Sequence, residues 1–498
     1  MKYIYFKYHQ LINRTFVILL ILVSYLFFPT HNSSLDSFAY AGYVKYNYSL
    51  FTPHHLLSNA IIFVLIKPLY NLNFTIDILL FSKFVNSTFQ FLNLFIFYKI
   101  LSFLKVKETS KLLYILILAF SFSLWRYGTE NETYIIPITF SLLSSFYYIK
   151  HLYKFSYFYI FISSLFGIIA CLFHQIHVFW WLGLFVGFLL FKRNIKVVFY
   201  YLLPSILLPI TYCLVIYFYN AQEITFTNFQ YFVLNDFYKG TVVTNFGWKG
   251  VFFQIINTFR TYFQIHPNIY LLIKHNLIYA FPLVFCLFIG LNILYQIRKK
   301  RKILLKKENY LKIIIQIHIG IFVCNYLFAY YNNGNVEFMV MLPYILILCV
   351  IIKYNIDQLI LLRLAVLLFI WNFSYGIFPN YNYNYFNDDV LVDFMINNKD
   401  KTYIIERRTT INHYFYKTGI YDPKNIFLLE NVSETELQNL VDKNKTLYTD
   451  VINKPEILNK AKISSENKSL DLNTYTNTNL FYYDSFYGKN YLHKISKK

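Results

Sequence analysis

The amino-acid sequence predicts an all-α, polytopic bundle of membrane-spanning helices followed by a small C-terminal α/β domain. Of the 498 residues, 57% are hydrophobic and the mean hydropathy is +0.41, whereas soluble domains average about 45–50% apolar residues. Apolar runs of about twenty residues, the length that crosses the hydrocarbon core as a helix, recur from residue 15 to residue 378. The runs are continuously apolar rather than alternating, which predicts helices and not barrel strands.

The membrane domain is expected over residues 1–378. The first span follows Lys2, Lys7 and Arg14 without an A-x-A cleavage motif, so we expect an uncleaved anchor helix with its N-terminus inside. Outer segments are expected at 30–75 and at 220–276, the second carrying interfacial helices. About eleven spans are predicted, over 14–29, 76–103, 112–125, 133–149, 157–173, 178–191, 197–219, 277–297, 313–331, 338–353 and 358–378.

Residues 56–70 decide the orientation of the bundle. If this segment crossed the membrane, every later basic cluster would lie outside. Lys67 and Pro68 interrupt it, and an interfacial position instead puts all the clusters in the cytoplasm, as the positive-inside rule requires. The clusters are Lys105–Lys111, Lys150 with Lys154, Lys192–Lys196, and Arg298–Lys312.

The polar tail, residues 379–498, is expected to form an α/β domain outside the cytoplasm. Segments 401–406, 425–430 and 446–452 are predicted strands. Segment 433–444 is a predicted helix that opens with a capping box of Ser433 and Glu436. No glycine motif for nucleotide binding occurs in it.

Composition limits the partners of the chain. Its net charge of +21 is explained by cytoplasmic basic clusters and by AT-rich coding, which the abundance of Lys, Asn, Ile and Phe indicates, so no nucleic-acid partner is expected. Such coding is typical of some bacteria, and the inner membrane of a bacterium is the expected location, with the endoplasmic reticulum membrane of an AT-rich eukaryote as the alternative. All five cysteines lie in apolar segments, so no disulfide framework is implied.

Polar residues concentrate at the outer ends of the predicted spans. Asp36 follows the first span; a carboxylate there can act as a general base or hold a divalent cation, or it is simply a solvated or helix-capping residue. His54 and His55 are adjacent and cannot share a helix face, which argues against a two-histidine metal site. One of them is a candidate to bind a phosphate or a sugar.

Two further candidates, Lys83 and Asn86, lie near the outer end of the second span, where a lysine either binds phosphate or extends to the interface. Arg126, Glu130 and Glu132 occupy one short outer turn, which is a candidate sugar-binding rim. A solvated turn is the alternative.

His174 and His177 lie at another outer junction and are spaced to share a helical face. Asn335 and Glu337 precede the tenth predicted span. Ionisable groups at the membrane rim are candidates for function, because placing a charge in lipid costs at least ~2.5 kcal/mol.

The order of these motifs resembles that of the GT-C superfamily of polytopic glycosyltransferases, such as protein O-mannosyltransferase-like and aminoarabinose-transferase-like enzymes. The similarity is clearest over the first 190 residues, and Ser37 stands where many members carry a second acid. The motifs are Asp36, the Pro/His stretch 53–55, SKFVNS (82–87), Trp125 with Glu132-Thr-Tyr134, and FHQIH (173–177).

This resemblance implies transfer of a sugar from a polyprenyl-phosphate donor to a protein, lipid or glycan acceptor on the outer face. Lys83, Arg126 or a histidine would meet the donor phosphate. Asp36 would deprotonate the acceptor hydroxyl, with inversion at the anomeric carbon. Segments 30–75 and 220–276 would roof the cavity, and the tail would help to bind the acceptor. No cofactor is required by the sequence, although a divalent cation is compatible with it.

Two other classes of protein stay open. One is a polysaccharide polymerase or ligase, for which segment 220–276 offers Arg260, His266 and His275. The other is a lipid or solute transporter, which would be expected to show internal repeats and polar residues at mid-membrane. No clear repeat is present, and the polar residues lie at the outer ends.

Overall fold

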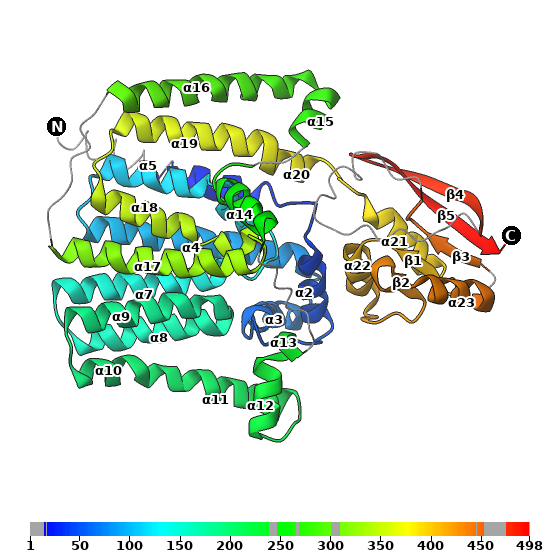
Figure 1. Cartoon of the computed structure of the whole chain (residues 1–498), viewed down its shortest axis with the longest axis horizontal. Coiled ribbons are helices and arrows are strands. Elements are labelled where there is room, and N and C mark those ends of the chain that lie inside the picture. Colours follow the sequence, from blue (N-terminus) through cyan, green and yellow to red (C-terminus); the bar gives the residue numbers. More distant parts are fainter. Residues whose placement is uncertain are drawn as a thin grey trace. The chain divides into compact units, whose positions relative to one another are not determined.

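The computed structural model describes residues 14–15, 17–238, 247–264, 268–299, 309–444, 446–452 and 475–497. It is mostly helical, with a five-stranded sheet in the C-terminal part of the chain (Figure 1). The chain divides into two compact units. The first comprises Met1–Pro29, Ser49–Thr75 and Leu80–Phe378, and the second comprises Thr30–Tyr48, Ile76–Leu79 and Pro379–Lys498.

The first unit is a bundle of long helices around one apolar core that includes Phe97, Leu118 and Ile314. Its helices are Val17–Leu26, α3 (Ser58–Asn71), α4 (Ile78–Phe103), α5 (Glu108–Ala119), α6 (Phe122–Gly128), α7 (Ile135–Tyr153), α8 (Tyr157–Phe173), η1 (Gln175–His177), α9 (Val178–Phe191), α10 (Ile195–Leu202), α11 (Leu207–Leu214), α12 (Phe226–Val233), α13 (Asn235–Tyr238), α14 (Trp248–Arg260), α15 (Asn268–His275), α16 (Ala280–Lys299), α17 (Asn309–Tyr331), η5 (Val336–Met339), α18 (Leu342–Lys353) and α19 (Gln358–Asn372). Helix α20 (Phe378–Asn382) follows, and all but its first residue belong to the second unit.

Five helices of the described residues are long and apolar enough to cross a membrane: Ile195–Tyr219, Leu277–Arg298, Leu311–Tyr331, Val336–Lys353 and Gln358–Asn382. The bent pair α5 and α6 makes a sixth if it counts as one span. The helix Val17–Leu26, α8 and η1 with α9 are apolar but shorter. These apolar helices are what a membrane protein would contain. The expected number of about eleven spans stays a prediction.

Helix α4 shows why length and hydropathy do not single out every predicted span. Its polar side chains Asn86, Gln90 and Asn93 lower its hydropathy, yet all three are buried inside the bundle. Asn93, for example, donates from Nδ2 to the Ile135 carbonyl oxygen (3.0 Å) and accepts from Thr139 Oγ1 (2.5 Å). Polar groups paired within a bundle are compatible with helices in lipid.

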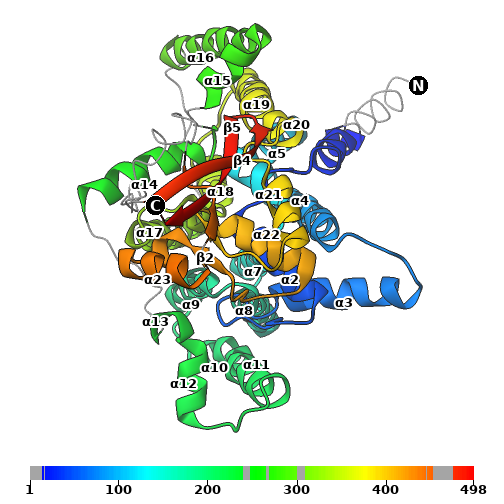
Figure 2. The ribbon, with the colours of Figure 1, turned by 90° about the vertical axis from the view of Figure 1, so that its right-hand side faces the viewer.

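Segments 56–70 and 220–276 both form helices. Helix α3 lies across the long helices rather than along them (Figures 1 and 2), which is the orientation expected of an interfacial helix. Segment 220–276 carries the short helices α12 to α15, while its residues 239–246 and 265–267 lie outside the described residues.

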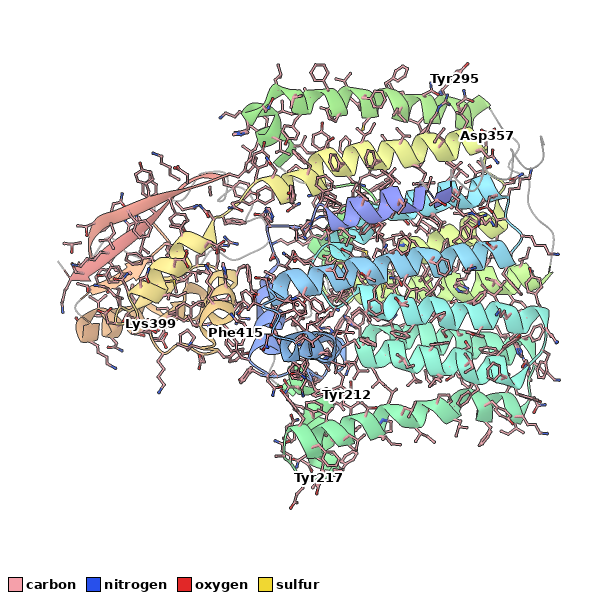
Figure 3. The ribbon with its side chains drawn as sticks, turned by 180° about the vertical axis from the view of Figure 1, so that it is seen from behind. Tyr212, Tyr217, Tyr295, Asp357, Lys399 and Phe415 are labelled. Atoms are coloured by element: carbon pink, nitrogen blue, oxygen red, sulfur yellow. The ribbon has the colours of Figure 1, made fainter. Side chains whose placement is uncertain are left out.

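Four helices share one direction in the bundle. α4, α7, α9 and α18 each begin beside candidate site residues and end at lysines. Figure 3 makes the two ends visible, since Tyr212 lies at the candidate-site end and Tyr295 and Asp357 lie at the other. Of the expected basic clusters, residues 300–308 lie outside the described residues, as do Lys2 and Lys7.

The second unit is an α/β domain. Its helices and strands are α2 (Leu35–Lys45), α21 (Asp388–Asn397), β1 (Tyr403–Ile405), α22 (Arg408–Thr418), β2 (Ile426–Leu428), α23 (Glu434–Asn444), β3 (Thr446–Thr449), β4 (Tyr475–Ser485) and β5 (Gly488–Lys497). The strand order is β2-β1-β3-β5-β4. β1 pairs in parallel with β2 and β3, whereas β3, β5 and β4 pair antiparallel.

The predicted strands at 401–406, 425–430 and 446–452 are confirmed as β1, β2 and β3. The capping box is also confirmed: Ser433 N donates to Glu436 Oε2 (2.8 Å), and Glu436 N donates to Ser433 Oγ (3.2 Å). The hairpin β4–β5 is not predicted from the sequence.

Helix α2 belongs to the second unit, although its residues fall in the predicted outer segment 30–75. It packs on α22, where Phe38 stacks on His413 with ring centroids 4.1 Å apart. Asn412 Nδ2 donates to the Leu35 carbonyl oxygen (2.9 Å). At Gly42 an added Cβ would lie 2.4 Å from the Phe415 ring, so only glycine allows this close approach of the two helices.

Candidate functional site

Glu130 is the centre of a buried charged cluster at one end of the bundle. Its carboxylate accepts a hydrogen bond from Arg126 NH1 (2.9 Å) and lies 3.6 Å from Lys83 Nζ. It also accepts from the Asn131 backbone N–H (3.0 Å). The side chain of Glu130 is only 1% exposed, and that of Lys83 only 6%. The two cations compensate the charge of this buried carboxylate, because an unpaired buried charge would be far more costly.

Asn86 fixes the turn that carries these acids. Its Nδ2 donates to the carbonyl oxygens of Glu130 (2.7 Å) and Glu132 (2.8 Å). The next residue of α4 also contributes, since Ser87 Oγ donates to the Gly128 carbonyl oxygen (2.8 Å). A buried turn needs such partners for its backbone groups, so α4 holds the Arg126–Glu132 segment in one conformation.

Glu337 connects the cluster to the turn before α18. Its Oε2 accepts from Tyr134 Oη (3.2 Å) and from Asn335 Nδ2 (3.1 Å), and Asn335 Oδ1 accepts from the Glu337 N–H (3.1 Å). Tyr134 begins α7 two residues after Glu132, so the carboxylate bridges two turns that are far apart in the sequence.

Arg260, at the C-terminus of α14, adds a third cation. Burial lowers its pKa from the ordinary value, and Tyr127, Arg126 and Glu337 lie close enough to contribute to its electrostatic environment. A guanidinium remains protonated under such a shift. Its Nε is buried and has no hydrogen-bond partner within the described part of the chain.

Four histidines from two turns extend the cluster. The His55 and His174 rings are 4.4 Å apart at their centroids, and the His174 ring lies 4.9 Å from that of Tyr134. His54 Nδ1 donates to Gln175 Oε1 (3.2 Å), and Gln175 Nε2 donates to the Pro53 carbonyl oxygen (3.0 Å). The turns at 53–55 and 174–177 are thereby held together.

His55, His174 and His177 are neutral at physiological pH, because burial lowers the pKa of each ring. Burial, with a contribution from His54, lowers the pKa of His55 to about 3. Burial and the neighbouring His55, His177 and His54 rings lower the pKa of His174 well below its usual value. His174 Nδ1 accepts from the Ile176 N–H (3.3 Å), so the proton of the neutral ring is on Nε2. That buried N–H finds no acceptor among the described residues.

The described residues contain no group of three or more His, Cys, Asp or Glu side chains arranged to hold a metal ion. The adjacent His54 and His55 rings, with centroids 6.2 Å apart and 71° between their planes, do not converge on one point. The two rings therefore do not form a two-histidine metal site.

Asp36 lies in the second unit, in the first turn of α2, whose N-cap Ser34 accepts from the Ser37 N–H. A carboxylate in the first turn of a helix is stabilised by the helix dipole. The Asp36 side chain is partly exposed and contributes to the electrostatic environment of Tyr43.

Nine of the ten sequence-predicted site residues are therefore joined by contacts within the first unit: His54, His55, Lys83, Asn86, Arg126, Glu130, Glu132, His174 and Glu337. From the sequence, Arg260 is a candidate only for a polymerase or ligase, and Tyr134 is only a member of the motif with Trp125 and Glu132. A lone arginine inside segment 220–276 carries no local signal that it folds back on the turn at Arg126. Of the other two candidates there, His266 lies outside the described residues, and His275 is the last residue of α15.

No protein-family model matches the chain, and no curated protein matches its sequence. The resemblance to glycosyltransferases therefore remains a prediction from short motifs.

Proposed function

We propose that the chain is an integral membrane glycosyltransferase that moves a sugar from a polyprenyl-phosphate-linked donor to an acceptor on the extracytoplasmic face. The observation that carries this function is the buried cluster of Lys83, Arg126 and Arg260 with three carboxylates at one end of an apolar bundle. Charged groups at a membrane rim are costly, and a structural role alone rarely requires six of them.

A polyprenyl-phosphate donor fits this chemistry. Its hydrocarbon tail belongs in the membrane, while its phosphate becomes a dianionic leaving group as the glycosidic bond breaks. Cations and N–H donors held in place around that group stabilise the developing charge. Arg260 Nε–H and His174 Nε2–H, which have no hydrogen-bond partner among the described residues, are suited to that role. Lys83 and Arg126 are already paired with Glu130 and contribute mainly to the local potential.

The transfer step needs a general base. The acceptor hydroxyl oxygen attacks the anomeric carbon, the bond from that carbon to the phosphate oxygen breaks, and polyprenyl phosphate leaves with the electron pair. The hydroxyl proton passes to a carboxylate, which we assign to Asp36, and displacement from the opposite face inverts the anomeric centre. A general base contributes about 10²–10⁴-fold to the rate.

The first test uses purified full-length protein in lipid nanodiscs with a panel of radiolabelled polyprenyl-phosphate sugars. Sugar transfer is expected with at least one donor, and Asp36→Asn is expected to lower kcat by about a hundredfold or more. Asp422→Asn, at an exposed position of the same unit, is the matched control and should keep the wild-type rate. Full activity of Asp36→Asn with normal expression would remove Asp36 from the mechanism. Transport of the lipid without any sugar transfer would favour a flippase instead.

A further inference from the structure

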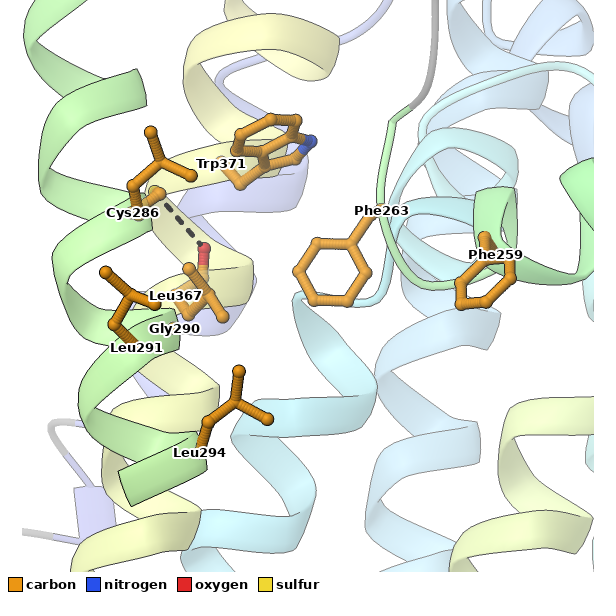
Figure 4. Close-up of a pocket in the computed structure, with 9 residues that line it drawn as sticks. Phe259, Phe263, Cys286, Gly290, Leu291, Leu294, Leu367 and Trp371 are labelled. Atoms are coloured by element: carbon orange, nitrogen blue, oxygen red, sulfur yellow. Dashed lines mark hydrogen bonds between the residues drawn. The ribbon is translucent and has the colours of Figure 1, made fainter. Parts of the chain in front are cut away.

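An apolar groove of about 440 Å³ lies in the first unit outside the charged cluster (Figure 4). One wall is the face of α16 from Cys286 to Leu294, and α19 contributes Leu367 and Trp371. Phe259 and Phe263, at and just beyond the end of α14, line the remaining side. Along α16 the groove extends for about 12 Å, at 1.5 Å per residue.

The polar atoms near the groove already have partners. Trp371 Nε1 donates to the Gln264 carbonyl oxygen (2.9 Å), and Cys286 Sγ contacts the Leu367 carbonyl oxygen (4.0 Å). The surface offered to an occupant is therefore hydrocarbon, which favours an alkyl or isoprenoid chain over a sugar or a peptide.

Side chains of α16 that line the groove are themselves exposed, since Leu287, Leu291 and Leu294 are 58–67% exposed. On the same helix Phe281, Val284 and Phe288 are 66–73% exposed. Only 17% of the most apolar 18-residue stretch of Leu277–Arg298 is buried. Such a helix faces lipid in a membrane, because water would not tolerate so large an apolar surface. The occupant of a groove beside it comes from the bilayer.

The end of α14 joins the groove to the charged cluster. Phe259 lines the groove, and Arg260 is the next residue of the same helix. The following turn is fixed to the start of α6, since Ser123 N and Ser123 Oγ both donate to the Thr261 carbonyl oxygen (3.1 and 3.0 Å). α6 carries Arg126 and Tyr127 at its other end.

We propose that this groove holds the isoprenoid chain of the polyprenyl-phosphate donor and that Arg260 binds the donor phosphate. The assignment rests on the proposed function, and it names the site at which the donor is held. A phospholipid acyl chain has the same hydrocarbon chemistry. The isoprenoid source is chosen because Arg260, the cation next to the groove, has an Nε–H without a hydrogen-bond partner among the described residues and has Arg126 and Glu337 in its electrostatic environment.

Gly290 provides a direct test, because it lines the groove and a Cβ added there meets nothing within 4 Å. Gly290→Phe is therefore expected to fill the groove without strain. Gly320→Phe on α17 is the matched control, since that glycine is equally open and does not line the groove. Binding of a photoreactive polyprenyl phosphate without sugar is measured on the full-length protein in nanodiscs. Gly290→Phe should weaken it by about tenfold or more, which corresponds to about 1.4 kcal/mol, and Gly320→Phe should leave it unchanged.

Arg260→Gln tests the phosphate contact separately. It should weaken binding of polyprenyl phosphate but leave the affinity for uncharged polyprenol unchanged. Should Gly290→Phe not fold, a photoreactive residue at Leu291 of the otherwise unchanged chain reports the same contact by cross-linking to the lipid. Equal binding by the two glycine variants, no cross-link at Leu291, or full competition by phosphatidylglycerol at equal concentration would each overturn the assignment.

Binding of the sugar-free lipid is independent of catalysis, so two failures can be told apart. Groove-dependent binding without sugar transfer by any donor would support the lipid site and contradict the transferase. Sugar transfer that is unaffected by Gly290→Phe would support the transferase and contradict the lipid site.

Discussion

At the scale of single residues, Glu130 explains how the bundle accommodates buried cations. Lys83 and Arg126 come from different helices and meet at one carboxylate that is 1% exposed. Removing one member of such a group leaves a buried charge without compensation, which costs far more than the intact group contributes. The same residue therefore controls both the stability and the electrostatic potential of the candidate site.

Glu130→Gln is accordingly expected to destabilise the protein by about 3 kcal/mol or more. The measurement is the unfolding temperature of the purified protein in detergent. Glu223→Gln, at an exposed position, is the control and should unfold like the wild type. An unchanged unfolding temperature for Glu130→Gln would mean that the two cations do not depend on this carboxylate.

The buried histidines predict a pH dependence. His55 has a folded-state pKa of about 3, below the value of about 6.5 in an unfolded chain. Between these values the unfolded state binds more protons, so the contribution to stability is present above pH 6.5 and is lost as the pH falls toward 3. His55→Gln should reduce the slope of stability against pH in this window by up to about 1.4 kcal/mol per unit.

The readout is denaturant unfolding at a series of pH values, with pH 8 as the reference at which the ring is neutral. Parallel curves for wild type and His55→Gln below pH 6.5 would contradict a buried neutral imidazole at this position.

At the scale of elements, four helices repeat one arrangement. α4, α7, α9 and α18 start beside candidate site residues, such as Lys83 and Glu132, and end at lysines, such as Lys150 and Lys353. Each helix thus carries its polar residues at one end of the bundle and its basic residues at the other. This repetition is what the positive-inside rule predicts for a site on the extracytoplasmic face.

The start of α23 offers a prediction at the same scale. Ser433→Ala removes the side-chain acceptor for the Glu436 N–H, which should cost about 1 kcal/mol in the first turn of the helix. Hydrogen exchange of that amide in the full-length protein should become about fivefold faster, because a loss of 1 kcal/mol raises the population of the open state by about that factor. Gln438→Ala, at an exposed position of the same helix, should leave the exchange unchanged; equal acceleration in both variants would contradict the capping role.

At the scale of the whole molecule, the chain consists of an apolar helical unit and an α/β unit that includes α2. Stretches of sequence separated by more than three hundred residues build the second unit, since α2 packs on α22. Thr30–Tyr48 therefore belongs to the same unit as the C-terminal part of the chain.

The predicted topology can be tested with single cysteines in a Cys-free background. Asn333 and Thr435 are exposed positions of the first and second units, and Thr109 is exposed near the lysine-rich ends of the helices. We expect a membrane-impermeant maleimide to label the first two in intact cells and Thr109 only after permeabilisation. Labelling of Thr109 and not of Asn333 in intact cells would invert the bundle and remove the candidate site from the extracytoplasmic face.

Local signals in the sequence were sufficient for much of this description. Apolar runs predict the helices because lipid requires every backbone group to be paired within its own segment. The capping box at Ser433 and Glu436 is equally local, because its partners are three residues apart. The order of polar residues at predicted helix ends was enough to select nine side chains that lie together.

Only the tertiary structure decided which groups meet across the fold. It placed Arg260 beside the turn at Arg126, joined Tyr134 to Glu337, and assigned α2 to the C-terminal unit. It also formed the β4–β5 hairpin, whose strands are largely polar and carry a weak apolar pattern. These contacts depend on the packing of segments that are distant in the chain, and no single stretch of sequence contains the distances between them.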